Sequence, residues 1–195
     1  MKYTAFGRTL VSIGLTVGLL TGVAHAETFK WAGKTDPQTM DPHAVNSAPV
    51  LGFLNNVYEG LVRRNKQMKI EGALAESWEP LGTSGWRFNL RKGVKFHDGT
   101  PFTADDVVFS AKRLRHPDSD LRVRLSADTQ VVKVDDHTVD FVTKAPNPIL
   151  HVEWDTWYIM SKAWTEKHGA ELLALAFPDH QEILLYILPV QLMDF

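Results

Sequence analysis

The sequence predicts a mixed α/β fold of the α+β type. Two kinds of pattern predict it: short segments with a period of two, typical of strands with one buried face, and segments with helical spacing of apolar residues. The clearest strand is 86–91, where Trp86, Phe88 and Leu90 alternate with polar residues, and the clearest helix is 104–114. The chain contains six Trp and ten Phe, which supply enough apolar bulk for a core.

Residues 1–26 have the pattern of a secretory signal peptide. Lys2 and Arg8 precede an apolar run at residues 10–23, and the segment ends in Ala-His-Ala at residues 24–26. The run is shorter than the roughly 20 residues that a helix needs to span a bilayer. We therefore expect cleavage before Glu27 and a periplasmic protein that is not integral to the membrane.

The composition argues against several classes of function. Without Lys2 and Arg8, 19 basic residues remain against 23 acidic ones, with no cluster of either sign that would indicate a nucleic-acid partner. Cysteine is absent, which excludes disulfides, thiol catalysis, thiolate metal sites and a lipid-modified cysteine after the signal. The chain has neither a Gly-x-Ser-x-Gly nor a His-Glu-x-x-His motif, and no two histidines have close helical spacing. We expect a protein that is not an enzyme, with no catalytic residue, metal or cofactor.

Along the chain, residues 28–32 are predicted to form a strand that leads into a polar loop. Apolar residues at helical spacing predict a helix over 50–62, and after strand 86–91 a second short strand is expected to carry Val94 and Phe96. For helix 104–114, Thr103 is the expected N-cap, with its hydroxyl accepting from the backbone N–H of Asp106. Phe102 and Val107 have the spacing of a hydrophobic staple, and Pro117 follows the end of the helix.

The last patterned elements are a hairpin and a short helix. Residues 131–134 and 139–142 flank a polar turn, and Ser161 is the expected cap of a helix that ends at Gly169. Between them, Trp154, Trp157 and Tyr158 fit either a core or the aromatic wall of a ligand site, and core packing is favoured. Residues 171–195 contain no Lys, Arg, Gly, Ser or Thr, and this shift predicts a boundary near Ala170.

Longer motifs carry a resemblance to a known family. The segment LAESWE at 74–79, followed by WRFNLRKGVKFHDGTPFTADDVVFS at 86–110, resembles the signature of the family 5 extracellular solute-binding proteins. Three more pieces agree in order: Met-Asp-Pro-His at 40–43, VYEGLV at 57–62, and DDHTV at 135–139 leading to SKAWTEKHG at 161–169. The resemblance covers about residues 28–169.

The resemblance implies a two-lobed periplasmic binding protein (type II, cluster C-like) that captures a small peptide or a similar solute and delivers it to the membrane permease of an ABC transporter. Closure of such lobes about a hinge encloses the ligand. It also implies that Asn46, Ser47 and Ala48 line the ligand cleft and that the stretch 121–124 approaches it, with Arg122 as the ligand-contact candidate there.

The sequence departs from the family in length and in its last segment. Family members are well over twice as long, so residues 27–170 are interpreted as part of the first lobe, with the second lobe missing, and 171–195 as a non-family apolar tail. Two hypotheses follow: a truncated substrate-binding component of an importer, or a frameshifted fragment without binding activity. A periplasmic hydrolase is a third hypothesis, which the absence of a nucleophile motif disfavours.

Overall fold

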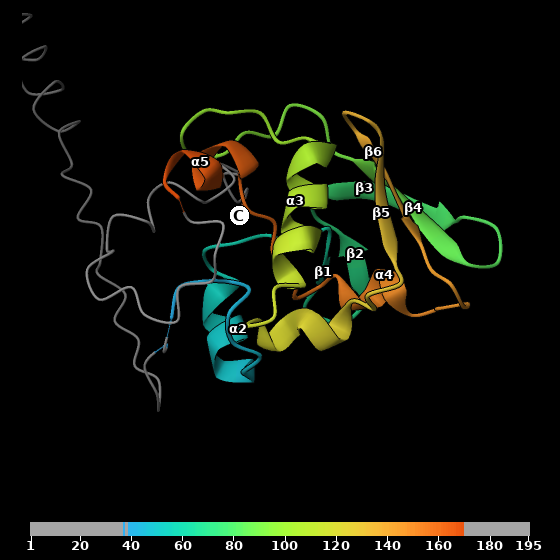
Figure 1. The fold of residues 1–195 in the computed structure, drawn as a ribbon, viewed down its shortest axis with the longest axis horizontal. Helices are drawn as coiled ribbons and strands as arrows, with labels where there is room; N and C mark the ends of the chain where they lie inside the picture. The colour runs from blue at the N-terminus through green and yellow to red at the C-terminus, as the bar shows by residue number, and fades with distance from the viewer. Residues whose placement is uncertain (1–36, 38, 170–195) are drawn as a thin grey trace, which may run out of the picture. The chain divides into compact units, whose positions relative to one another are not determined.

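The structure is a computed structural model that describes residue 37 and residues 39–169 (Figure 1). The predicted signal peptide, the predicted strand at 28–32 and segment 171–195 lie outside the described residues. Within them, helices and strands are mixed, as the sequence predicts. None of the helices in this part of the chain is long and apolar enough to cross a membrane.

A four-stranded antiparallel sheet with the order β3-β4-β6-β5 is the largest element of the fold. Its strands are β3 (Ala75–Pro80), β4 (Gly85–Leu90), β5 (Gln130–Asp135) and β6 (Thr138–Val142). The register places Phe88 opposite Val139 on the neighbouring strand and Trp86 opposite Phe141. One face of the sheet is therefore apolar, because side chains directly opposite each other on paired strands point to the same face.

The apolar face is covered by helices and by the C-terminal part of the described chain. Helix α3 (Ala104–Leu114) packs against β5 and β6, and also contacts α5 (Lys162–Lys167). The rings of Phe88, Phe141, Trp154 and Trp157 follow one another edge to face, with centroids 5.4, 4.6 and 4.0 Å apart along the series. Such contacts add to the stabilisation from burying aromatic area. Trp154, Trp157 and Tyr158 are at most 1% exposed, so the core interpretation of these residues is confirmed.

Helix α3 has the predicted bounds, and Thr103 and Asp106 form a capping box at its start. The Asp106 carboxylate accepts from the backbone N–H of Thr103 at 2.8 Å and from the Thr103 hydroxyl at 3.3 Å. The backbone N–H of Asp106 donates to the Thr103 carbonyl oxygen at 3.1 Å. Phe102 and Val107 are both buried, as the staple predicts. The β5–β6 hairpin and α5, whose Ser161 hydroxyl accepts from the Trp164 N–H at 3.2 Å, are also confirmed.

The predicted helix over 50–62 is wrong in its second half. Helix α2 is Ala48–Leu54, and Val62 already begins strand β1 (Val62–Arg64), which pairs with β2 (Ile70–Gly72). The chain must pass close to another backbone at Gly60, where a Cβ would lie 2.5 Å from the Trp154 carbonyl oxygen. Gly60 instead forms an isolated β-bridge with Tyr158. A helix through this position would separate the two segments.

The second short strand predicted around Val94 and Phe96 is also wrong. Both residues are buried, but the local pairing is limited to an isolated bridge between Lys95 and Pro101. The turn within this bridge is closed by Asp98, whose carboxylate accepts from the Thr100 N–H and hydroxyl. Two short elements, α4 (Leu150–Glu153) and the 3₁₀ helix η1 (Asp120–Arg124), complete the described chain.

Candidate functional site

The predicted ligand loop, 46–48, follows a buried segment that fixes its position. Arg113 of α3 forms a bidentate ion pair with Asp41, with Nη1–Oδ1 and Nη2–Oδ2 distances of 2.7 and 2.6 Å. Both side chains are almost fully buried, at 2% and 1% exposed. A buried Arg–carboxylate pair is strongly directional, so it sets the orientation of the chain just before the loop.

His43 extends this pair into a three-residue network. Its Nε2 lies 2.8 Å from the Tyr158 carbonyl oxygen, and its Nδ1 lies 3.2 Å from Arg113 Nη1. Because a carbonyl can only accept and a guanidinium can only donate, we assign the proton to Nε2 and leave Nδ1 as an acceptor. Burial, with the Arg113 charge beside it, lowers the pKa of His43 to about 4. The ring is therefore neutral at physiological pH.

Further hydrogen bonds connect residues 39–44 to η1, to Ser119 directly before it, and to Tyr58. The Ser119 hydroxyl donates to the His43 carbonyl oxygen at 2.6 Å, and the Asp120 N–H donates to the Ala44 carbonyl oxygen at 3.1 Å. Tyr58 donates to the Met40 carbonyl oxygen at 2.9 Å. Residues 39–44 are thus held against α3, η1 and the segment around Tyr158.

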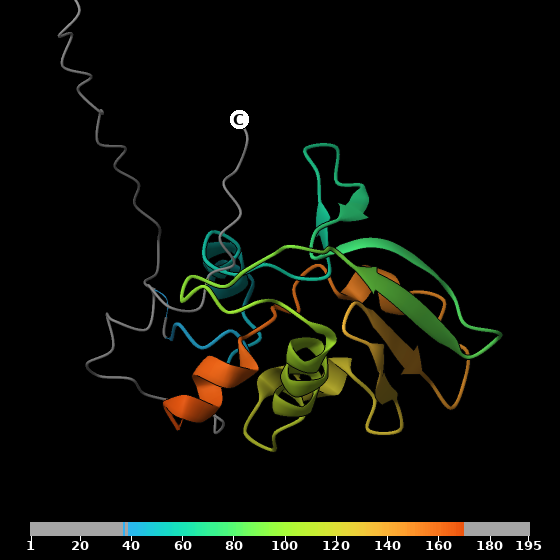
Figure 2. The same ribbon diagram turned by 90° about the horizontal axis from the view of Figure 1, so that it is seen from above.

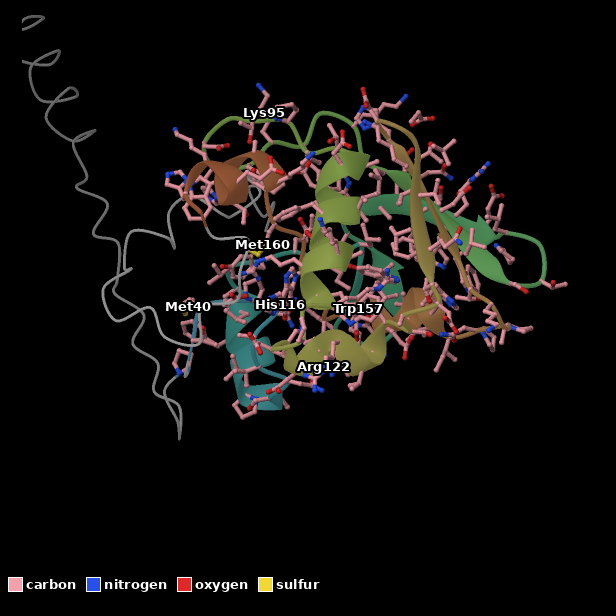
Figure 3. All side chains as sticks on the ribbon, in the orientation of Figure 1. Met40, Lys95, His116, Arg122, Trp157 and Met160 are labelled. Carbon is pink, nitrogen blue, oxygen red and sulfur yellow. The ribbon has the colours of Figure 1, made fainter. Side chains whose placement is uncertain are left out.

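The structure brings two of the predicted regions, the loop and η1, into contact, but through Arg124 and not Arg122. Arg124 Nη2 donates to Asn46 Oδ1 at 2.8 Å, and Nη1 donates to the Thr156 hydroxyl. Arg122 is exposed on η1, in the lower part of the molecule in Figure 3, and donates to the Ser119 carbonyl oxygen at 2.7 Å. The sequence analysis included Arg124 only as the last residue of the stretch 121–124 and did not single it out. In a 3₁₀ helix, residues three apart share a face, and Arg124 is three residues after the buried Leu121.

Ser47 and Ala48 lie at the start of α2. Ser47 is its N-cap residue in an extended conformation, and its side chain makes no capping hydrogen bond. Its carbonyl oxygen accepts from the Leu51 N–H at 2.8 Å. Asn46 and Ala48 are exposed and Ser47 is half-buried, so the loop presents a polar, accessible surface.

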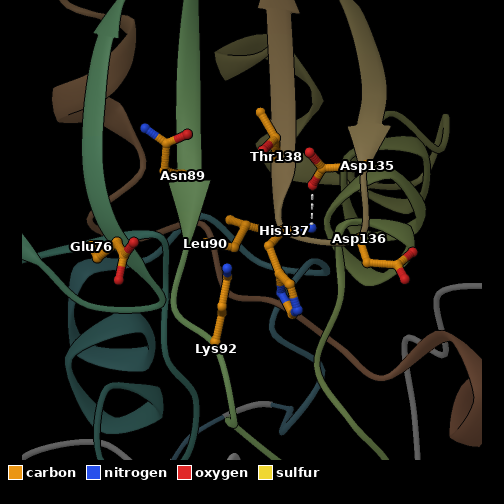
Figure 4. Close-up of a pocket in the computed structure, with 8 residues that line it drawn as sticks. All are labelled: Glu76, Asn89, Leu90, Lys92, Asp135, Asp136, His137 and Thr138. Atoms are coloured by element: carbon orange, nitrogen blue, oxygen red, sulfur yellow. Dashed lines mark hydrogen bonds between the residues drawn. The ribbon is translucent and has the colours of Figure 1, made fainter.

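A pocket lies at another place in the fold. It has a volume of about 440 Å³ and opens beside the end of β4 and the β5–β6 turn (Figure 4). It is lined by Glu76, Asn89, Leu90, Lys92, Asp135, Asp136, His137 and Thr138. Two of its acidic groups have partners: the His137 backbone N–H lowers the pKa of Asp135, and a hydrogen bond from Lys133 lowers that of Asp136. None of the predicted ligand-contact residues lines this pocket.

Metal ligation was considered because the chain contains several histidines. Across the described residues, no group of three or more His, Asp or Glu side chains is arranged to hold a metal ion. His43 uses both of its ring nitrogens within the buried network. The candidate site is therefore the loop 46–48 with η1, built from amide, hydroxyl and guanidinium groups. Such groups bind polar solutes through hydrogen bonds.

Comparison with known proteins defines the family. Residues 69–179 match the model of the bacterial extracellular solute-binding proteins, family 5 Middle, which is more than half of the chain. The chain belongs to this family. The matched segment includes the sheet, α3 and the hairpin described above, and it runs past the boundary predicted near Ala170.

Comparisons with individual proteins agree with the assignment of the chain to family 5. It is 27% identical over 176 residues to the periplasmic oligopeptide-binding protein OppA of Escherichia coli K12, covering 74% of the chain and 32% of OppA. It is 29% identical over 174 residues to the glutathione-binding protein GsiB of Shigella boydii, covering 84% of the chain and 33% of GsiB. The solved structure of AgaA from A. tumefaciens R10 with agropinic acid superposes with a TM-score of 0.64 at 28% identity, covering 71% of the chain and 29% of AgaA.

Two facts follow for the family 5 chain. Its fold is that of part of a periplasmic binding protein, because the described α/β arrangement superposes on solved members of the family. It also spans only about a third of the length of these relatives. The relatives are named as binding proteins for an oligopeptide and for glutathione, which supports a solute-binding role.

Proposed function

We propose that this chain is part of the periplasmic substrate-binding component of an ABC importer for small peptides or similar solutes. In this proposal it binds without covalent chemistry, is exported by its first 26 residues, and works with a membrane permease. The relatives named for oligopeptide and glutathione support a peptide-like ligand. The family membership supports the transport role.

The buried Asp41–His43–Arg113 network is the observation that carries the proposal. Residues 41–43 and Arg113 are buried, so they present no surface to a ligand. They nevertheless fix the chain directly before an exposed polar loop. A binding loop benefits from such anchoring, because a loop that is already ordered loses less conformational entropy when it binds.

Within this site we propose Asn46, Ser47, Ala48 and Arg122 as ligand contacts. The Ser47 side chain makes no capping bond, so its hydroxyl is available to a ligand. Arg122 has five N–H donors, of which one contacts the Ser119 carbonyl oxygen, and the remaining ones suit a carboxylate. Arg124 orders the Asn46 side chain through its hydrogen bond to Oδ1.

Titration calorimetry with tripeptides and with glutathione tests the proposal. We expect saturable binding that weakens at least roughly 10-fold in Arg122→Ala, since a hydrogen bond to a charged group contributes about 1.5–3 kcal/mol. Lys112→Ala is the matched control, because Lys112 is an exposed basic residue on α3. Equal weakening in both variants would refute the assignment of Arg122.

Absence of any saturable binding by a folded chain would instead favour the alternative, a frameshifted fragment without binding activity. That alternative has its own test. If the gene is sequenced past codon 170 and translated in all three frames, a family-like sequence in another frame would support a frameshift. If no other frame contains family-like sequence, that result would argue against a frameshift.

A further inference from the structure

A short β-hairpin projects from the body of the fold. Strands β1 and β2 pair from Val62 opposite Gly72 to Arg64 opposite Ile70, and Figure 2 shows their connecting turn extending beyond the neighbouring elements. This turn, residues 65–69, is termed the hairpin tip. It lies outside the candidate ligand site, which is formed by the loop before α2 and by η1.

The tip is unusual in its combination of charge and exposed apolar surface. Met68 is 68% exposed, and Lys66 and Lys69 on either side of it are exposed as well. Neither lysine forms an ion pair with any described residue, whereas Arg63 and Arg64 on β1 pair with Glu71 and Asp155 at 2.8 and 2.6 Å. The tip thus presents two exposed lysines without an ion-pair partner among the described residues, next to an exposed methionine.

The tip is also rigidly built. Asn65 Oδ1 accepts from the backbone N–H groups of Gln67 and Lys69, both at 3.0 Å. Arg64 Nη1 donates to the Met68 carbonyl oxygen at 3.2 Å. Among residues 39–169, Met68 is the only residue other than glycine with a positive φ, at 61°. That conformation costs free energy for a residue with a side chain, so the turn holds Met68 outward at a cost that Gly or Asn would not incur.

We propose that the hairpin tip binds the surface of a membrane that contains acidic phospholipids. Two lysines would contact lipid phosphates while the Met68 side chain enters the boundary between headgroups and acyl chains. An exposed basic segment gains about 1 kcal/mol per Lys near an acidic leaflet, about fivefold in binding for each residue. Long lysine stems can lie along apolar surface while their ammonium groups stay in water.

A lipid surface fits the tip better than a protein partner does. A stable protein interface needs roughly 20–30 residues a side with complementary shape. The tip is convex and spans only residues 65–69, so it offers too little area for such an interface. A bilayer requires no shape complementarity, and its affinity depends on charge and inserted apolar area.

The absence of cysteine from the chain allows a site-specific test. A nitrobenzoxadiazole probe on Met68→Cys reports the polarity at the tip itself, so binding by other segments does not interfere. Vesicles of phosphatidylglycerol and phosphatidylcholine in equal parts are compared with pure phosphatidylcholine. We expect a blue shift on the acidic vesicles only, and its loss at high salt, because the Debye length falls to about 3 Å at 1 M.

Charge variants of the labelled chain complete the test. Lys66→Glu with Lys69→Glu should weaken binding at least about 20-fold. The matched control, Lys112→Glu with Lys144→Glu, changes the net charge equally at two exposed lysines elsewhere and should leave the probe's response unchanged. An aqueous probe on acidic vesicles, or equal weakening in the control, would overturn the proposal. An equal response to soluble polyglutamate would also overturn it, in favour of an acidic protein.

Discussion

The neutral, buried His43 should make the stability of this chain depend on pH in a defined window. In the folded state its pKa is about 4, compared with 6.5 in the unfolded chain. Between these values the unfolded state binds more protons, so the free energy of unfolding rises with pH and falls as the solution is acidified. The stabilisation is complete above about pH 6.5 and is lost progressively down to about pH 4.

The magnitude follows from the size of the pKa shift. Each pKa unit corresponds to about 1.4 kcal/mol, so acidification through the whole window should cost about 3 kcal/mol. Between about pH 7 and pH 4.5 the expected loss is about 2 kcal/mol. The structural cause is first the burial of the ring, which disfavours its charged form, and second that a protonated Nδ1 would place another donor 3.2 Å from Arg113 Nη1.

Urea denaturation of the chain and of His43→Gln, each at about pH 7 and pH 4.5, measures this effect. Gln retains a donor for the Tyr158 carbonyl oxygen but does not titrate, so the variant should be less stable at neutral pH and lose about 2 kcal/mol less on acidification. The comparison is needed because Asp106 and His151 also have shifted pKa values, raised and lowered by burial, respectively. Parallel pH dependence in the two proteins would refute the role assigned to His43.

Three further predictions concern the contacts that hold the site and its supports. Asp41→Asn should reduce the free energy of unfolding by about 3–5 kcal/mol, because removing one partner of a buried ion pair is strongly destabilising; a loss below about 1 kcal/mol in urea melts would contradict this. Gly60→Ala should cost about 1–3 kcal/mol, because the added Cβ meets the Trp154 carbonyl oxygen at 2.5 Å; an unchanged melting temperature would show that the two backbones can separate freely. Ser161→Ala removes the oxygen that accepts from the Trp164 N–H and should cost about 1 kcal/mol; an unchanged midpoint of urea unfolding would contradict this.

The elements that the sequence predicted well are those set by neighbouring residues. Helix α3 has its predicted bounds because a staple, an acidic first turn and a following proline all act within a few residues of its ends. The β5–β6 hairpin is determined in the same way, by alternation and a polar turn. These signals do not depend on the rest of the chain.

The helix expected over 50–62 shows where such signals fail. Tyr58 and Leu61 are buried, so their apolar character did indicate a core position. Helical spacing nevertheless predicted the wrong backbone conformation, because these residues are buried by contact with a segment about 100 positions later. The Ile159 N–H donates to the Glu59 carbonyl oxygen at 3.0 Å, next to the bridge between Gly60 and Tyr158. A local pattern cannot distinguish a helix face from an irregular segment that is covered by a distant one.

The same limit applies to the candidate site, and it explains why the anchoring groups were missed. Asp41 and Arg113 are 72 positions apart, and the Arg on α3 directly follows the exposed Lys112. In an amphipathic helix an arginine is usually read as part of the solvent face, since burying its charge is costly without a paired acid. Only the tertiary fold shows that Asp41 supplies that acid. If Asp41 and Arg113 anchor the ligand loop, loss of their ion pair should weaken ligand binding even though neither residue contacts the ligand. Asp41→Asn should therefore lower the affinity for the ligand under conditions where the chain is still folded.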